Sequence, residues 1–165
     1  MATIDILVSI DTETILNTYG HSLDPQNPVL VPNNPNLIYM IVKNDSAVSG
    51  QAAAELNIRA ETMDTIRWRA TSLSLNSDSE VILISYSGAP ALISQPQPLI
   101  ATVNCPLPNP NDPNNPTTQT IKSYFFNSTV LDPGVVTYHF VFLIIDRHGT
   151  KKGYYHWDPF ITITA

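Results

Sequence analysis

The sequence predicts an all-β protein, an immunoglobulin-like antiparallel β-sandwich of about eight or nine strands with long Pro/Asn-rich loops. Several segments alternate apolar and polar residues with the period of two that half-buried strands show. The 14 prolines fall outside any convincing helical pattern and gather with asparagines. Trp68 and Tyr138 occupy positions at which such sandwiches place a core tryptophan and a tyrosine corner.

Composition indicates one domain, residues 1–165, with few charges on its surface. Charged residues make up 13% of the chain, about half the usual share, and the net charge is −6. The Lys and Arg side chains form no basic stripe, so we expect neither nucleic acid nor a membrane surface as a partner. The single cysteine, Cys105, permits no internal disulfide. The N-terminus lacks the basic region of a signal peptide, so we expect a cytoplasmic protein, with non-classical export left open.

The N-terminal half begins with a strand and a short helical turn. Thr3–Ile10 alternates cleanly, and Asp11 or Thr12 can cap the turn that follows. Residues 21–36 contain four prolines and four asparagines and are expected to form a surface loop. The further strands expected here are Leu37–Val42, Ala52–Ala60 and Thr65–Ala70, the last with Trp68 facing the core and both arginines facing out.

The middle of the chain is expected to alternate between short strands and polar connections. Glu80–Tyr86 is almost continuously apolar, which favours a strand buried on both faces. Asn104–Thr118 contains five prolines and five asparagines, which predicts an extended loop outside the interior of any sheet. The remaining expected elements are a turn at Asn76–Ser79, a loop at Gly88–Pro98, and strands at Leu99–Val103 and Gln119–Phe126.

The C-terminal segment reads as a hairpin. Val135–Ile145 and Tyr154–Thr164 are rich in β-branched and aromatic residues, and Asp146–Gly153 has the composition of a turn. Asp158-Pro159 should interrupt the second strand, since proline cannot donate a ladder hydrogen bond. Tyr138 follows a Pro-Gly turn, which favours a tyrosine corner whose hydroxyl bonds to the preceding backbone; an ordinary hairpin with a buried tyrosine is the alternative.

No catalytic constellation is evident in the sequence. It lacks a G-x-S-x-G elbow and a glycine-rich phosphate loop, so we do not expect an enzyme. His139 and His156 could share one face if their strands pair, but no third metal ligand is evident. Acids in the loops suit Ca²⁺, yet they lack the spacing of a calcium loop, and solvated loop acids are the better interpretation. We therefore predict no metal and no cofactor.

The residues most able to contact a ligand or partner are acids in the loops, an arginine in the expected turn of the C-terminal hairpin, and aromatic residues. Acids and an arginine suit polar partners, and exposed aromatics such as Tyr19, Tyr155 and Trp157 could form a platform for a sugar. The candidates are Asp11, Glu13, Tyr19, Asp24, Arg147, Tyr155 and Asp158.

Several stretches read together carry a family resemblance. They are Ile6–Tyr19, Ser49–Ala52 with Glu55–Ile58, Ile66–Leu75, Pro106–Pro110, Tyr138–Phe140 and Gly153–Ile163 with its Trp157–Phe160. In this combination, over nearly the whole chain, the sequence resembles the AidA/PixA family of bacterial inclusion-body proteins. The resemblance implies an immunoglobulin-like fold and, for some members, cytoplasmic inclusions formed in one growth phase, or quorum-sensing control with links to virulence or host colonisation. It supplies no catalytic residues. With only three methionines, the chain is not expected to act as a methionine store.

The function expected is that of a non-enzymatic protein that forms homo-oligomers. Low charge density favours self-association, because few charges lose water at a contact. The alternative is a carbohydrate-binding module of the lectin type, with a glycan as partner and possible dependence on calcium.

Overall fold

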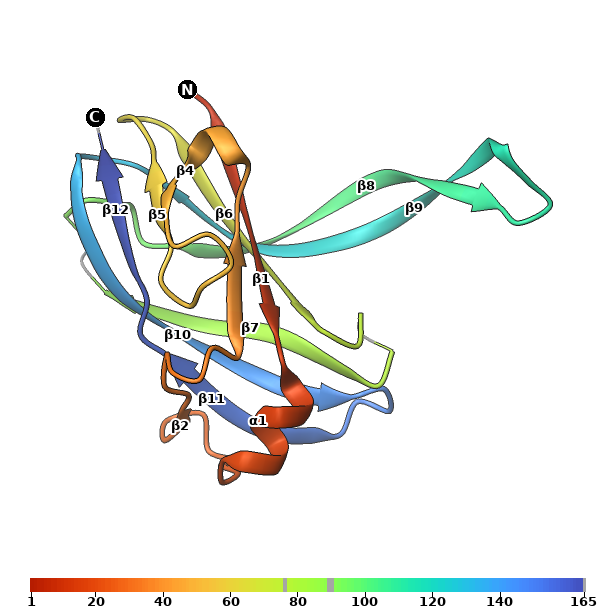
Figure 1. Cartoon of the computed structure of the whole chain (residues 1–165), viewed down its shortest axis with the longest axis horizontal. Helices are drawn as coiled ribbons and strands as arrows, with labels where there is room; N and C mark the ends of the chain where they lie inside the picture. The colour runs from red at the N-terminus through yellow and green to blue at the C-terminus, as the bar shows by residue number, and fades with distance from the viewer. Residues whose placement is uncertain (76, 89–90, 165) are drawn as a thin grey trace.

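The computed structural model describes residues 1–75, 77–88 and 91–164, and most of these residues lie in two β-sheets (Figure 1). One sheet has the order β3-β1-β6-β9-β8, and the other has the order β2-β11-β10-β12-β5-β4 with β7 also paired to β10. The all-β class is confirmed. The elements are β1 (Thr3–Ile10), α1 (Thr12–Thr18), β2 (Val29–Leu30), β3 (Ile38–Ile41), a 3-10 turn (Asn44–Ser46), β4 (Ala47–Ser49), β5 (Asn57–Arg59), β6 (Thr65–Ser72), β7 (Ser79–Gly88), β8 (Gln97–Asn109), β9 (Asp112–Thr129), β10 (Gly134–Asp146), β11 (Lys151–Trp157) and β12 (Phe160–Thr164).

The most periodic segments form the elements expected of them. Strand β1 has the predicted bounds, and its isoleucines and Val8 are buried. Helix α1 follows at once, and the Asp11 carboxylate caps it by accepting the Thr14 backbone N–H at 3.0 Å. These features depend on local sequence, which explains why they could be predicted.

The expectation of a wholly antiparallel sandwich is wrong. Three strand pairs run parallel, namely β1 with β6, β2 with β11 and β5 with β12. Alternation shows which side chains face the core, but the direction of a neighbouring strand is set by long connections that cross between sheets. The described residues form twelve strands, several of only two or three residues, and the immunoglobulin-like assignment stays a prediction.

The two sheets are joined by a cluster of buried aromatic rings. Trp68 of β6 lies edge-on to Tyr138 and Phe140 of β10, with ring centroids 6.0 and 5.6 Å away. All three side chains are fully buried, so the predicted core tryptophan is confirmed. Aromatic pairs in this geometry stabilise a core beyond their buried area.

The tyrosine-corner prediction is wrong. The Tyr138 hydroxyl accepts a hydrogen bond from the Trp68 indole N–H at 3.3 Å, across the two sheets, instead of bonding to backbone. A buried indole N–H needs an acceptor, and Tyr138 lies opposite it. Burial also raises the pKa of Tyr138 far above that of a free tyrosine.

Strand β7 has one buried face, so the prediction of burial on both faces is also wrong. Val81, Leu83 and Tyr86 point into the core, whereas Glu80 and Ile84 are exposed. The pairing of β7 with β10 shifts register at Ile84, which turns Ile84 and Ser85 toward solvent together. Asn76 of the predicted turn and Ala89 and Pro90 of the predicted loop lie outside the described residues.

The Pro/Asn-rich stretch after Val103 is the largest departure from expectation. Asn104–Thr118 was expected to be a loop, but its residues extend β8 and β9 into one long hairpin, paired from Gln97↔Asn127 to Asn109↔Asp112. Figure 1 shows this ribbon projecting away from both sheets. Prolines fit there because each strand of a two-stranded ribbon has an open edge, where a missing N–H breaks no ladder bond.

The C-terminal hairpin forms as predicted. Strand β10 pairs first with β12 and then with β11, and the break falls at Asp158-Pro159. The loop of residues 21–36 also stays mostly irregular, with only β2 in it. No helix among the described residues is long and apolar enough to cross a bilayer.

Candidate functional site

A pocket lies beside the N-terminal end of α1, where acids from distant parts of the chain converge. It brings together two of the predicted candidates, Asp11 and Glu13, with residues from the β6–β7 turn and the β10–β11 hairpin. Its lining consists of Asp11, Thr12, Glu13, Leu16, Leu73, Ser74, Asp78, Ser79, Asp146 and Lys152. We call it the α1 pocket.

Two of the four carboxylates in the α1 pocket are already bound by the chain itself. Asp11 caps α1 through Thr14. Asp146 accepts the backbone N–H groups of Thr150 and His148, each at 2.9 Å, and lies 3.0 Å from Lys152 Nζ. These contacts, with that of Thr150 largest, lower the pKa of Asp146 to about 2. Asp11 and Asp146 therefore stabilise local structure. Glu13 and Asp78 are the two carboxylates of the pocket that are held by fewer contacts within the chain.

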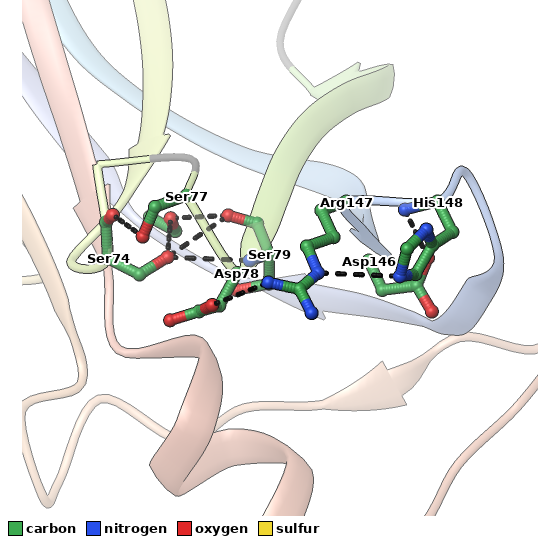
Figure 2. Close-up of polar contacts among 8 residues, drawn as sticks. Ser74, Ser77, Asp78, Ser79, Asp146, Arg147 and His148 are labelled. Carbon is green, nitrogen blue, oxygen red and sulfur yellow. Dashed lines mark hydrogen bonds and ion pairs between the residues drawn. The ribbon is translucent and has the colours of Figure 1, made fainter.

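Arg147 lies beside Asp78, which lines the α1 pocket (Figure 2). Its guanidinium is 4.0 Å from Asp78 and its Nε donates to His148 Nε2 at 3.4 Å. The Arg147 side chain is 65% exposed, so these contacts contribute little to stability. On the other side of Asp78, Ser74, Ser77 and Ser79 bond to one another and to nearby backbone, which closes the turn.

Tyr155 cannot serve as a surface platform, which corrects the sequence prediction. It is fully buried, and its hydroxyl bonds to His21 Nδ1 at 3.0 Å. Trp157 is fully buried as well. Both residues belong to the inner face of β11, because alternation along a strand sends every second side chain into the core.

The other loop candidates lie apart from the α1 pocket. Tyr19 is partly buried and packs on the core. Asp24 closes its own turn by accepting the Gln26 N–H at 2.9 Å and the Asn27 side-chain amide at 2.6 Å, and these bonds lower its pKa. Neither residue joins a cluster of candidate residues.

Asp158 is the candidate that the fold places beside other chemically active groups. Its carboxylate contacts His139 and His156 on the outer face of the C-terminal hairpin. The sequence predicts only that the two histidines can share a face. The meeting with Asp158 was missed because the Asp158-Pro159 break was expected to end the pairing, whereas the register of β10 continues through it from β11 to β12.

The β8–β9 ribbon carries a surface that the sequence interpretation missed. Side chains on one face of it are apolar and partly exposed, with Leu99, Leu107 and Ile121 exposed by 46, 44 and 39%. The alternation from Leu99 to Leu107 indicates a strand with one apolar face, but the prolines in the same stretch favour a loop. We call this surface the ribbon apolar face; it comprises Leu99, Ala101, Val103, Cys105, Leu107 and Ile121.

At its base the ribbon apolar face continues onto the outer face of the first sheet. Phe125 pairs with Leu99 and lies under the guanidinium groups of Arg67 and Arg69, 5.2 and 4.6 Å from the ring centre. Arg69 also pairs with Asp5 of β1. The cation–π contacts cover Phe125 and leave the distal apolar residues open.

The comparisons with known proteins agree with this architecture. The sequence model of the PixA family, described as inclusion body protein, matches residues 2–163. The chain belongs to the PixA family. The crystal structure of the PixA inclusion body protein from Burkholderia cenocepacia J2315 superposes with a TM-score of 0.82 at 19% identity, covering 99% of this chain and 96% of that one. This PixA chain therefore shares its fold with that protein.

Two further comparisons add nothing to the PixA assignment. The solution structure of amebosin covers 84% of this chain and 99% of its own, but its TM-score of 0.23 at 5% identity carries no argument about the fold. No curated protein sequence matches the chain.

Proposed function

We propose that this PixA-family chain is a non-enzymatic protein that self-associates, with the β8–β9 ribbon as its main contact. The observation that supports this is the ribbon apolar face, which lies on a hairpin that projects from the body and leaves Leu99, Leu107 and Ile121 exposed by 46, 44 and 39%. A two-stranded ribbon is marginally stable in water by itself, so a partner that covers its apolar face would stabilise it. Each square ångström of apolar surface removed from water contributes about 25 cal/mol.

Charge favours a second copy of the same chain as that partner. The net charge of −6 would make two copies repel, but the ribbon holds only one acid, Asp112, and one base, Lys122. A contact made by the ribbon is therefore electrically neutral and desolvates few charges. From Asp112 to Phe125 the second edge of β9 has no partner strand among the described residues, so this edge can also pair with a strand of another copy.

The experiment compares two substitutions on opposite faces of the ribbon. Val103→Asp places a charge on the ribbon apolar face, and the matched control Thr102→Asp places the same charge on the opposite face one residue away. Sedimentation velocity over a concentration series should show assembly of the wild type and of Thr102→Asp, and at least about tenfold weaker assembly of Val103→Asp.

Two outcomes would contradict the proposal. One is a wild-type chain that stays monomeric at the highest soluble concentration. The other is an equal loss of assembly in both variants, since a contact through one face must distinguish them.

For the biological setting, we propose the one that the resemblance to the inclusion-body family implies. Assembly in the cytoplasm would produce inclusions, under growth-phase or quorum-sensing control and with a role in host interaction. Fluorescence imaging of the labelled chain through a growth curve tests this setting: inclusions confined to one phase are expected, and diffuse signal in every phase would contradict it.

A further inference from the structure

We propose that His139, His156 and Asp158 form a binding site for one divalent transition-metal ion, with Zn²⁺ as the first choice. The inference rests on the convergence of three ligating side chains and is independent of self-association. We call these three residues the His2Asp site.

The hairpin places both imidazoles on one face. Phe140 pairs with Trp157 and both point into the core, so the neighbouring residues His139 and His156 point outward. Val141 lies opposite His156, so the same register puts His139 opposite Asp158, the first residue after β11. Cross-strand and diagonal neighbours on one face of a sheet are close enough for their side chains to meet.

The ligand atoms are already close to one another. His139 Nδ1 is 2.5 Å and His156 Nδ1 is 3.1 Å from the same oxygen of Asp158, and one ligand atom from each residue lies within 4.8 Å of the others. In a tetrahedral zinc site, bonds of about 2.0–2.2 Å separate ligand atoms by about 3.3–3.6 Å. Movement of about 1 Å by side chains at the surface therefore makes room for the ion.

The backbone around the His2Asp site is held by hydrogen bonds. The His156 carbonyl accepts the Val31 N–H at 2.8 Å, and the Pro159 carbonyl accepts the Tyr138 N–H at 3.1 Å. The side chains themselves remain accessible, with His139, Asp158 and His156 exposed by 46, 40 and 25%. A shallow hollow that includes Pro28 and Ser87 adjoins the two imidazoles and gives a water molecule access to a fourth ligand position.

The donor set selects the class of metal. Two imidazole nitrogens and one carboxylate suit Zn²⁺, Cu²⁺, Ni²⁺ and Fe²⁺, whereas Ca²⁺ and Mg²⁺ prefer oxygen ligands throughout. The carboxylate also offsets one of the two charges of the ion, which the neutral imidazoles leave uncompensated.

The experiment titrates the full-length chain, first stripped with a chelator that is then removed, with Zn²⁺ by calorimetry and with Co²⁺ by visible absorption. The wild type should bind one ion per chain, and the Co²⁺ complex should show the absorption of a low-coordinate nitrogen and oxygen site. His139→Ala, His156→Ala and Asp158→Asn should each weaken binding by at least about tenfold, since even indirect support of a ligand is worth that much. The matched control is His148→Ala, which removes a histidine from the exposed β10–β11 turn.

Unfolding curves in the presence of chelator separate loss of a ligand from loss of the fold. The three ligand variants should unfold like the wild type there, and only the wild type and His148→Ala should gain stability when Zn²⁺ is added. The proposal is overturned if the wild type shows no saturable binding at one ion per chain, or if His148→Ala weakens binding as much as His139→Ala does. It is also overturned if the ligand variants bind as tightly as the wild type.

Discussion

The core between the two sheets and the β8–β9 ribbon use the same alternating pattern, yet only the core is covered. In the core, Trp68, Tyr138 and Phe140 meet across the sheets and are fully buried. In the ribbon, apolar residues from Ala101 to Leu107 alternate with Thr102, Asn104 and Pro106 in the same way, but Leu99 and Leu107 remain more than two-fifths exposed. Alternation thus creates an apolar face, while the arrangement of the whole molecule decides whether that face stabilises the monomer or stays open for a partner.

Because only the core is covered, the two regions are expected to have different roles. Burial of large aromatic side chains is the main source of stability in a domain, so changes in the core should alter the free energy of unfolding. Near its base the ribbon contacts the body: β9 pairs with β6 from Phe126 to Thr129, and Ser123 and Tyr124 bond to Arg69 and Leu83. Changes farther out on the ribbon should alter assembly instead.

The largest effect is expected from Trp68→Ala. The change removes an indole that contacts two aromatic rings and leaves a cavity, which should lower the free energy of unfolding by about 3–5 kcal/mol. Urea denaturation followed by circular dichroism measures the loss. As a milder variant, Tyr138→Phe removes only the acceptor of the indole N–H and should cost about 1–3 kcal/mol. A loss below 1 kcal/mol in Trp68→Ala would show that the aromatic cluster does not hold the sheets together.

An intermediate effect is expected from Asp64→Asn, and it should depend on pH. The buried Asp64 carboxylate accepts the backbone N–H groups of Ala2 at 2.5 Å and of Glu61 at 3.0 Å, and these bonds lower its pKa in the folded chain. A carboxyl with a lowered folded-state pKa stabilises the fold above its unfolded pKa, near 3.8, and this stabilisation is lost as the pH falls through the folded-state pKa. At neutral pH the variant should be about 1.5–3 kcal/mol less stable.

Acid titration of the unfolding free energy checks the prediction for Asp64. The gap between wild type and Asp64→Asn should close as the pH falls below 3.8. The matched control is Asp112→Asn at the exposed tip of the ribbon, which should leave stability unchanged at every pH. A constant gap across the titration would exclude ionisation of Asp64 as the cause.

The smallest effect on monomer stability is expected from shortening the ribbon. Val103 and Ile121 face each other in the ladder, so residues 104–120 can be replaced by Asn-Gly, the preferred two-residue hairpin turn. The free energy of unfolding, measured where the chain is monomeric, should change by about 0.5 kcal/mol or less, while assembly in sedimentation experiments should weaken. A loss as large as that of Trp68→Ala would show that the ribbon belongs to the core, and the contrast between the two regions would be wrong.

The sequence alone determined the features that depend on neighbouring residues. Alternation placed β1 and the inward side chains of β6, Asp11 was recognisable as a helix cap, and Asp158-Pro159 had to interrupt its strand because proline lacks an N–H. Membership of the inclusion-body family was also recognisable, because its motifs extend over nearly the whole chain.

The features that depend on which strands become neighbours could not be predicted from the sequence. The parallel pairing of β1 with β6, the bond from Trp68 to Tyr138, and the meeting of Asp158 with two histidines all join residues through strand register. The same holds for the ribbon, where prolines that would break an inner strand are accommodated at open edges. The choice of neighbouring strand and the position of an edge are properties of the assembled sheets, and local alternation of residues does not specify them.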